Sequence, residues 1–389
     1  MTPDEFLGRV RALVPVVRER APIAEELRRL PPESVADFRN EGLFRAMQPR
    51  RYGGFELDPG IFFQAATEIG AACGSSGWIF GVVGVHNWHL ALFPPEAQED
   101  VWGSDTSILV STSLAPTGTV ERTPGGFRLT GRWSFSSGCD FCDWAVLGGI
   151  VPPDKDGAMP DARTFLLPRA DYGIEDNWHV MGLSGTGSKD IVVEGAFVPD
   201  YRTHGYLDAF YLKNPGMAVN DAPLYRLPFG LLFAYALSAA AIGAATGAFT
   251  SFREQQQRRV NLRDGGRVAE DPFAQLRLAE SAAETSAAHD RMLANFAEMM
   301  RLARAGEEIP LSLRARARWD AGKAVDWSVS AVDRLMMAAG GRAIFLANPL
   351  QRAWRDIHAM QAHAGTNLER AAQVFGRSEF GLPPTDIRF

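Results

Sequence analysis

An uncharged run from Leu227 to Phe252 constrains the fold more than any other part of the chain. The run is long enough to cross a bilayer, so a membrane span is one interpretation. Eight alanines, several glycines, Pro228, Ser238 and Thr246 make it only weakly apolar. A helix that is apolar on every side belongs inside a protein core. We therefore expect a buried helix in a bundle, with the membrane span as the weaker alternative.

The residue composition and pattern change twice along the chain, which divides it into three blocks. Residues 1–105 carry helix-start signals and apolar residues at helical spacing, as in LPPESVADFRNEGLF. Residues 106–215 contain β-branched and aromatic runs broken by Pro and Gly, whereas residues 216–389 return to Ala, Glu, Arg and Leu. This order predicts an α+β fold: an N-terminal helical domain, an antiparallel, β-barrel-like middle domain, and a C-terminal bundle of four or five helices with a tail.

Local signals refine this division. A helix is expected to begin near Asp58-Pro59 and to run to Cys73, because Asp is a good N-cap and Pro fits the first turn. Three segments look loose: about 202–222, about 261–272, and the tail from Ser378. Phe210 and Tyr211 lie in the first of them and are candidates for lining a substrate pocket.

Charge and cysteine content narrow the range of partners. The 389 residues include 40 Lys and Arg against 46 Asp and Glu, a formal charge of −6, without a basic block. Nucleic acid and membrane surfaces are therefore not expected as partners. Three cysteines, Cys73, Cys139 and Cys142, suit a reducing compartment better than a disulfide framework. With no secretory apolar core at the N-terminus, the expected location is the cytoplasm.

Short motifs for metals and phosphates are weak. Cys139 and Cys142 have the spacing of half a zinc site, but a second Cys pair is missing, so we expect two small core residues. His86 and His89 would share a helix face, yet no carboxylate lies near them, so no metal site is predicted. The Gly-rich run 182–188 fits a tight connection between strands as well as a phosphate cradle. P-loop, Rossmann and α/β-hydrolase motifs are absent from the sequence.

The block order and the segment GRWSFSSGCDFCDW (131–144) resemble the acyl-CoA dehydrogenase superfamily, in which a helical domain, a β domain and a four-helix bundle hold a flavin. A strand motif of that superfamily, G-x-K-x-W-I-T-N, places a hydroxyl against the flavin ring. Aligning Gly131 with its glycine puts Phe135 at the Trp and Ser137 at the Thr. The resemblance therefore implies that Phe135 and Ser137 bind the cofactor, whereas a hydroxyl satisfied by the backbone is the alternative for Ser137.

A second likeness lies near the C-terminus, where residues 354–366 resemble the dehydrogenase pattern R-D-x6-Y-E-G-T. Dehydrogenases carry their catalytic carboxylate at the E, and here that position is Ala364. Alanine cannot accept a proton, so a different flavin reaction is expected. The adjacent His363 has an ordinary pKa of about 6.5, which suits proton exchange near neutrality. His358 is the alternative candidate for this role.

These departures resemble the oxygenase components of two-component flavin monooxygenases, especially those that hydroxylate the phenolic ring of 9,10-seco-steroids. The similarity to these oxygenase components is carried by the runs RRYGGFELDPGIFF, CGSSGWIFGVVGVHNWHLALFP and MGLSGTGS. The resemblance implies reduced flavin, O2 and a C4a-hydroperoxyflavin that hydroxylates a phenol, with ortho attack on a multi-ring substrate expected. Its residue assignments are paired catalytic histidines at His86 and His363, hydroxyls at Ser113 and Ser137 facing the flavin and the substrate, and a flavin-phosphate or ribityl contact at Arg258 or Arg259.

The resemblance also implies a setting for this chemistry. We expect FMN, with FAD possible, a separate NAD(P)H-dependent flavin reductase, and a homotetramer. An apolar site would protect such a flavin species from water. The aromatic candidates for its walls are Trp78, Phe80, Trp88, Trp133, Phe135 and Trp144, for each of which core packing is the alternative. Other functions left open are an acyl-CoA dehydrogenase with a relocated base, an amino-sugar N-oxygenase, and a non-catalytic binding module.

Overall fold

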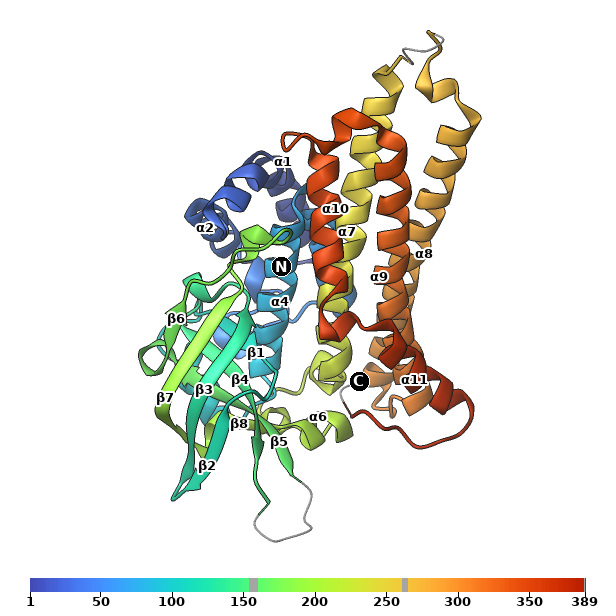
Figure 1. The fold of residues 1–389 in the computed structure, drawn as a ribbon. Helices are drawn as coiled ribbons and strands as arrows, with labels where there is room; N and C mark the ends of the chain where they lie inside the picture. The colour runs from blue at the N-terminus through green and yellow to red at the C-terminus, as the bar shows by residue number, and fades with distance from the viewer. Residues whose placement is uncertain (154–159, 261–264, 388) are drawn as a thin grey trace.

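A computed structural model describes residues 1–153, 160–260, 265–387 and 389. The chain begins with a helical region that lies against both the sheets and the long C-terminal helices (Figure 1). Its helices are α1 (Pro3–Leu27), α2 (Pro32–Asn40), α3 (Pro59–Ala72), α4 (Gly74–Leu90) and α5 (Pro95–Trp102). Every residue of α4 is buried, so this helix is the centre around which the three regions pack.

The helix start predicted near Asp58-Pro59 is confirmed, and a side chain caps the backbone there. Asp58 accepts a hydrogen bond from the Gly60 amide at 2.9 Å and Pro59 occupies the first turn of α3, which ends at Ala72, one residue before the predicted end. Thr2 caps α1 in the same way, with Glu5 bonding back to the Thr2 amide. Each cap satisfies a backbone donor that the helix itself leaves unpaired.

The middle region forms two four-stranded sheets with the orders β1-β4-β5-β8 and β2-β3-β7-β6. The strands are β1 (Val110–Ser113), β2 (Thr119–Thr123), β3 (Gly126–Ser136), β4 (Trp144–Val151), β5 (Asp161–Pro168), β6 (Gly173–Glu175), β7 (Lys189–Pro199) and β8 (Thr203–Gly205). Most pairs are antiparallel, as predicted, but β1 pairs with β4 in parallel, so a wholly antiparallel domain is wrong. The connection between these two strands runs through the other sheet, which permits the parallel pairing.

The C-terminal helices stand side by side as a bundle (Figure 1). They are α7 (Phe229–Arg258), α8 (Pro272–Ala305), α9 (Leu311–Ala339), α10 (Pro349–Gln361) and α11 (Leu368–Glu379). In the described part of the chain, α7 is the helix long and apolar enough to cross a membrane, and 83% of its most apolar window is buried inside the protein. The prediction of a buried bundle helix is therefore confirmed.

The three segments predicted to be loose have different outcomes. Residues 202–222 are ordered: they contain β8, the short helix α6 (Tyr206–Tyr211) and a 3-10 helix at Pro215–Ala218. Part of the second segment, residues 261–264, lies outside the described residues, whereas α8 begins at its end. The tail from Ser378 begins inside α11 and returns to the fold, because Phe389 is buried. The strands of the described chain lie within 106–215, although the domain boundaries stay a prediction.

Candidate functional site

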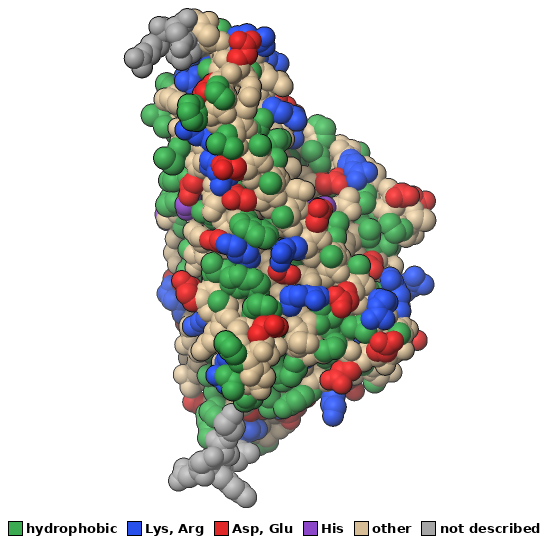
Figure 2. Space-filling view, turned by 90° about the vertical axis from the view of Figure 1, so that its right-hand side faces the viewer, with side chains coloured by type: hydrophobic (Ala, Val, Ile, Leu, Met, Phe, Trp, Pro, Cys, Tyr) green, Lys and Arg blue, Asp and Glu red, His purple; other side chains and the backbone are tan. Residues whose placement is uncertain are grey.

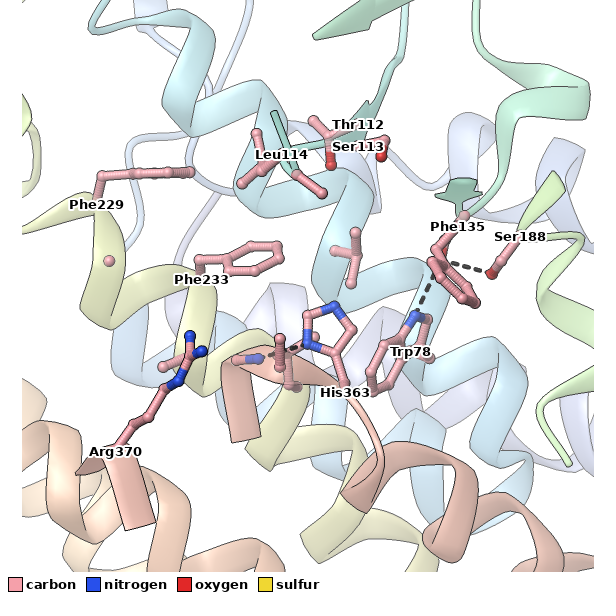
Figure 3. Close-up of a pocket in the computed structure, with 18 of the residues that line it drawn as sticks. Trp78, Thr112, Ser113, Leu114, Phe135, Ser188, Phe229, Phe233, His363 and Arg370 are labelled. Carbon is pink, nitrogen blue, oxygen red and sulfur yellow. Dashed lines mark hydrogen bonds between the residues drawn. The ribbon is translucent and has the colours of Figure 1, made fainter. Parts of the chain in front are cut away.

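A cavity of about 540 Å3 lies where the sheets meet the C-terminal bundle (Figure 3). Its size is that of pockets that hold drug-sized ligands. The walls come from α4, β1, β3, the loop before β7, α6, α7, the α10–α11 connection and the C-terminal tail. Two of these walls differ in chemistry, and we name them the hydroxyl wall (Trp78, Phe135, Ser137 and Ser188) and the aromatic wall (Phe210, Phe229 and Phe233).

The hydroxyl wall pairs an aromatic ring with a row of hydrogen bonds. Phe135 has a left-handed backbone (φ 68°) and leaves 66% of its surface exposed, with its ring edge-on to Trp178 at 6.1 Å. A phenylalanine in this conformation costs about 1–3 kcal/mol, a strain that proteins keep mainly at functional sites. Two residues later, Ser137 accepts a hydrogen bond from the Trp78 indole at 3.1 Å and lies 2.7 Å from the Ser188 hydroxyl. The motif that predicted Phe135 and Ser137 therefore delivers both to the pocket.

These residues fit a flavin ring, the cofactor that the sequence implies. Phe135 and Trp178 offer apolar ring surfaces, set edge to face, against which a tricyclic ring can pack, and Ser137 and Ser188 offer polar atoms beside them. The described residues contain no group of three or more His, Cys, Asp or Glu that could hold a metal ion. The flavin contacts of Phe135 and Ser137 stay a prediction.

Ser113 lines the cavity at the end of β1, and its hydrogen is already used. The Ser113 hydroxyl donates to the Ser134 carbonyl at 2.6 Å, so toward the cavity it offers only lone pairs. A ligand hydroxyl can therefore donate to Ser113 but cannot accept from it. The neighbouring Thr112 also lines the cavity, and its Oγ1 lies 2.5 Å from His86 Nε2.

His86 lies behind Thr112 and does not line the cavity. This differs from the prediction that His86 lies at the reacting groups. The histidine is fully buried on α4, its ring centroid is 5.7 Å from that of Phe233, and its action on a ligand has to pass through Thr112. Burial lowers the pKa of His86 to about 3, so its ring is neutral at pH 7.

His363 lies between the two walls, as Figure 3 shows, with ring centroids 5.6 Å from Trp78 and 5.9 Å from Phe233. The Gly365 amide donates to His363 Nδ1 at 2.9 Å. Because Nδ1 accepts, the neutral ring carries its hydrogen on Nε2, which turns toward the cavity. Burial, with a smaller contribution from Arg318, lowers the pKa of His363 to about 4. At neutral pH the side chain is thus a hydrogen-bond donor, which differs from the freely titrating group expected from its ordinary pKa.

The aromatic wall is supported by two further buried histidines. His89 stacks on Phe229 with a centroid distance of 3.9 Å, and its Nε2 lies 3.1 Å from His204 Nδ1. His204 Nε2 in turn donates to the Asn214 side-chain oxygen at 2.9 Å. Burial lowers the pKa of His204 to about 4 and that of His89 well below its ordinary value. These rings act as neutral, hydrogen-bonded packing groups.

Several predicted residues do not line this cavity. Arg258 ends α7, 21 residues beyond Leu237 and therefore about 30 Å along the helix from the last α7 residue in the wall. Arg259 instead donates to the Ala339 carbonyl at 2.6 Å. His358 bonds to Asp333 at 2.9 Å outside the cavity, so of the two candidate histidines His363 is the one in the wall.

Of the six aromatics expected as walls, Trp78 and Phe135 line the cavity. The other four have structural surroundings. Phe80 packs among core phenylalanines, and Trp133 is buried with its indole donating to the Gly148 carbonyl. Trp88 donates to the Leu224 carbonyl, whereas Trp144 lies under Arg202. For these four, core packing is the correct interpretation.

Sequence reasoning missed the Gly-rich loop and most of the aromatic wall. Leu183 and Ser188 of the loop line the cavity, and the loop is fixed by Asp356, which accepts a hydrogen bond from the Leu183 amide at 2.6 Å. Burial raises the pKa of Asp356 to about 6. The signal for this contact was the Arg355-Asp356 pair in the dehydrogenase-like pattern, but the pattern does not name its partner. The structure places Phe210 in the cavity as expected, while Tyr211 is exposed.

Comparison with known protein families gives two matches, one before the strands in the sequence and one after them. The model described as "Acyl-CoA dehydrogenase, N-terminal domain" matches residues 5–106. The model described as "Acyl-CoA dehydrogenase, C-terminal domain" matches residues 235–368. Both matches agree with the helical regions that flank the sheets.

Individual relatives match over almost the whole chain. The flavin-dependent monooxygenase oxygenase subunit HsaA of Rhodococcus jostii is 45% identical over 98% of this chain and 99% of its own length. The oxygenase component of the FADH2-dependent resorcinol hydroxylase of a Rhizobium species is 36% identical over 97% of this chain and 95% of its own. Among solved structures, the 3-HSA hydroxylase from Rhodococcus sp. RHA1 superposes with a TM-score of 0.95 at 44% identity, covering 99% of both chains.

Proposed function

Because this chain belongs to the flavin-dependent monooxygenase oxygenase components with the acyl-CoA dehydrogenase fold, we propose that its substrate is a multi-ring phenol, hydroxylated ortho to its hydroxyl group. The enzyme is an oxygenase component that hydroxylates an aromatic substrate with reduced flavin and O2. A separate reductase supplies the reduced flavin. The observation that carries the substrate proposal is the cavity itself, in which the lone pairs of Ser113 and the N–H of His363 border apolar, aromatic surfaces.

The chain's own residues divide the work of binding. The phenol hydroxyl donates to Ser113, whose own hydrogen is held by the Ser134 carbonyl. The His363 Nε2–H donates toward the reacting oxygen, and Gly365 fixes the direction of that donor. The aromatic wall holds the rings of the substrate and keeps water out. Bound reduced flavin supplies the electrons that activate O2.

The dehydrogenase alternative lacks its base. Ala364 lines the cavity at the position of the dehydrogenase carboxylate and cannot take a proton from a substrate. A dehydrogenase also needs no partner to reduce its flavin. We expect this protein, mixed with NADH and FMN but no reductase, to form no hydroxylated product above the free-flavin background.

Reduced FMN is the proposed cofactor, and reduced FAD is the alternative that the Rhizobium relative favours. Arg258 lies about 30 Å along α7 from the cavity of its own chain. If Arg258 contacts a flavin phosphate, we therefore propose that this flavin is bound in the cavity of another subunit. The proposed cellular location is the cytoplasm.

The proposed assembly is a homotetramer formed through the C-terminal bundle. Large apolar side chains are exposed on α8, at the end of α9 and just after it: Phe273, Leu276, Met337, Ile344, Phe345 and Leu346. Figure 2 shows hydrophobic side chains between charged ones along the bundle side of the molecule. Apolar surface of this kind is typical of contact sites between subunits. Light scattering should give a mass about four times 42.5 kDa, and a value near 42.5 kDa would contradict the tetramer.

Product analysis tests the function directly. The enzyme is mixed in air with chemically reduced FMN or FAD and a panel of one-ring and multi-ring phenols. We expect a product heavier by one oxygen atom, with the highest yield for a multi-ring phenol. If the yield were equal for all phenols, the substrate proposal would be wrong, and if no phenol gained oxygen, phenol hydroxylation itself would be wrong.

A further inference from the structure

A row of three hydroxyls leads from the Gly-rich loop to the cavity. The Thr186 hydroxyl donates to the Leu183 carbonyl at 2.8 Å. The Thr186 and Ser188 hydroxyls are 2.7 Å apart, as are those of Ser188 and Ser137. All three side chains are buried, and only Ser137 and Ser188 line the cavity. We refer to Thr186, Ser188 and Ser137 as the hydroxyl chain.

The direction of every hydrogen in this chain follows from its fixed end. A carbonyl oxygen can only accept, so the single hydrogen of Thr186 is used on Leu183. Ser188 must then donate to Thr186, which leaves Ser188 no hydrogen for Ser137. Ser137 must therefore donate to Ser188. At its other side Ser137 accepts the indole N–H of Trp78.

Ser137 consequently has one lone pair left and no hydrogen for the cavity. A hydroxyl group has one hydrogen and two acceptor positions, and here the hydrogen and one acceptor position are occupied within the protein. To a bound ring, Ser137 can act as a hydrogen-bond acceptor only. The resemblance of the Gly131–Ser137 segment to the superfamily motif implies that this hydroxyl faces the central nitrogen, N5, of the flavin ring.

We propose that Thr186 and Ser188 are positioning residues that hold Ser137 as an acceptor and thereby make the site prefer reduced over oxidised flavin. N5 of reduced flavin carries a hydrogen that can donate to Ser137, whereas N5 of oxidised flavin carries only a lone pair that faces the lone pair of Ser137. This proposal rests on the proposed function, because it takes flavin as the ligand of the hydroxyl wall. It adds two residues, one of them outside the cavity wall, that no motif identifies.

The surroundings of Thr186 oppose reversal of the chain. The Thr186 carbonyl accepts from the Gly138 amide at 3.0 Å, and the Thr186 amide donates to Leu183 at 3.0 Å. The Leu183 amide is held by Asp356 at 2.6 Å. For Ser137 to donate to the cavity, the Thr186–Leu183 hydrogen bond has to break or Ser188 has to lose its bond to Thr186. Either change costs the chain one hydrogen bond among buried groups, although the Leu183 carbonyl would still accept from the Trp178 indole at 3.1 Å.

Anaerobic titrations of the purified enzyme test this proposal without turnover. The dissociation constants of oxidised FMN and of dithionite-reduced FMN are measured for wild type, Thr186→Val and Ser188→Ala, and repeated with FAD. In both variants Ser137 regains a hydrogen that can turn toward the ring. We expect the ratio of the two constants, oxidised over reduced, to fall about fivefold to tenfold, the effect of one hydrogen bond.

Two matched variants control for loop damage. Thr186→Ser keeps the hydroxyl that donates to Leu183, and Ser184→Ala removes a hydroxyl of the same loop that bonds to Val180 instead of the chain. Both should keep the wild-type ratio. An unchanged ratio in Thr186→Val and Ser188→Ala, with reduced flavin still bound, would overturn the proposal while leaving the function intact. A wild-type protein that bound neither flavin in either state would instead contradict the proposed function.

Discussion

The two walls of the cavity are held together by different physical means. In the hydroxyl wall, each polar group has a partner and a direction, and the partners come from α4, β3 and the loop before β7. In the aromatic wall, packing dominates, and the polar groups behind it are neutral histidines. Directional bonds select one ligand and one state of that ligand, whereas packing tolerates variation in shape. We infer that the first wall fixes the cofactor and that the second decides which phenol is accepted.

Acid should damage the aromatic wall first, which is the largest effect we expect. His86, His89, His204 and His363 all have pKa values lowered by burial, so below about pH 6.5 the unfolded chain binds protons that the folded chain does not. Stability is therefore lost as pH falls. Asp356, whose pKa is raised to about 6, acts in the opposite direction between pH 6 and 4. The free energy of unfolding from urea titrations should fall by roughly 6 kcal/mol between pH 7 and 5.

A flat stability profile over this pH range would show that these histidines are hydrated or already charged in the folded protein. The variant His204→Gln provides the control, because it removes one titrating ring and keeps a side chain able to bond to Asn214. Its profile should be less steep than that of wild type.

His363 lies between the two walls, and removing its ring is expected to have the next largest effect. In His363→Ala the donor toward the reacting oxygen is lost, so product formation should fall about 100-fold. Reduced flavin and O2 should still be consumed, with hydrogen peroxide released in place of product. Measuring product and peroxide together separates this result from lost flavin binding. His358→Ala is the matched control, because His358 bonds to Asp333 outside the cavity; uncoupling in this variant alone would transfer the role to it.

Shortening the aromatic wall should change substrate choice without changing the flavin preference. Phe233→Ala removes a ring that contacts both His86 and His363 and should lower kcat/KM for the preferred phenol about tenfold. The ratio of oxidised to reduced flavin dissociation constants should stay at the wild-type value. If that ratio changed as much as in Thr186→Val, the division of labour between the walls would be wrong.

The smallest expected effect concerns Arg370, a cationic side chain of α11 that points toward Phe233 at the edge of the cavity (Figure 3). A phenol with a carboxylate or carbonyl at its far end can bind this guanidinium, but an exposed interaction of this kind is weak. Arg370→Gln should therefore raise KM for such phenols about threefold and leave KM for unsubstituted phenols unchanged. Equal changes for both kinds of phenol would remove Arg370 from the binding of substrate.

Sequence reasoning succeeded where local signals decide the structure. Asp58 and Pro59 determine a helix start by their own chemistry, and the uncharged run Leu227–Phe252 permits few positions other than a buried one. The parallel pairing of β1 with β4 was missed, because pairing between strands separated by a hairpin has no local signal.

The candidate site was only partly predictable for the same reason. Phe135 and Ser137 were predicted together because they stand two residues apart at the end of β3 and directly after it, and both line the cavity. Thr186 and Ser188 were treated as ordinary loop residues. The role of a hydroxyl depends on its hydrogen-bond partners, and the partner Ser137 comes from a distant segment of the chain. His86 was predicted to act at the reacting groups, but the structure places it behind Thr112, and that place depends on packing that no motif encodes.

The bond from Asp356 to the Leu183 amide has a consequence for local motion. It ties the loop beside the cavity to a helix of the bundle, so the loop cannot open alone without leaving a buried carboxylate unpaired. Amide hydrogen exchange at Leu183 should therefore be as slow as exchange within α10, although Leu183 lies in a turn. The cofactor side of the cavity would then open only together with the bundle, as one cooperative unit.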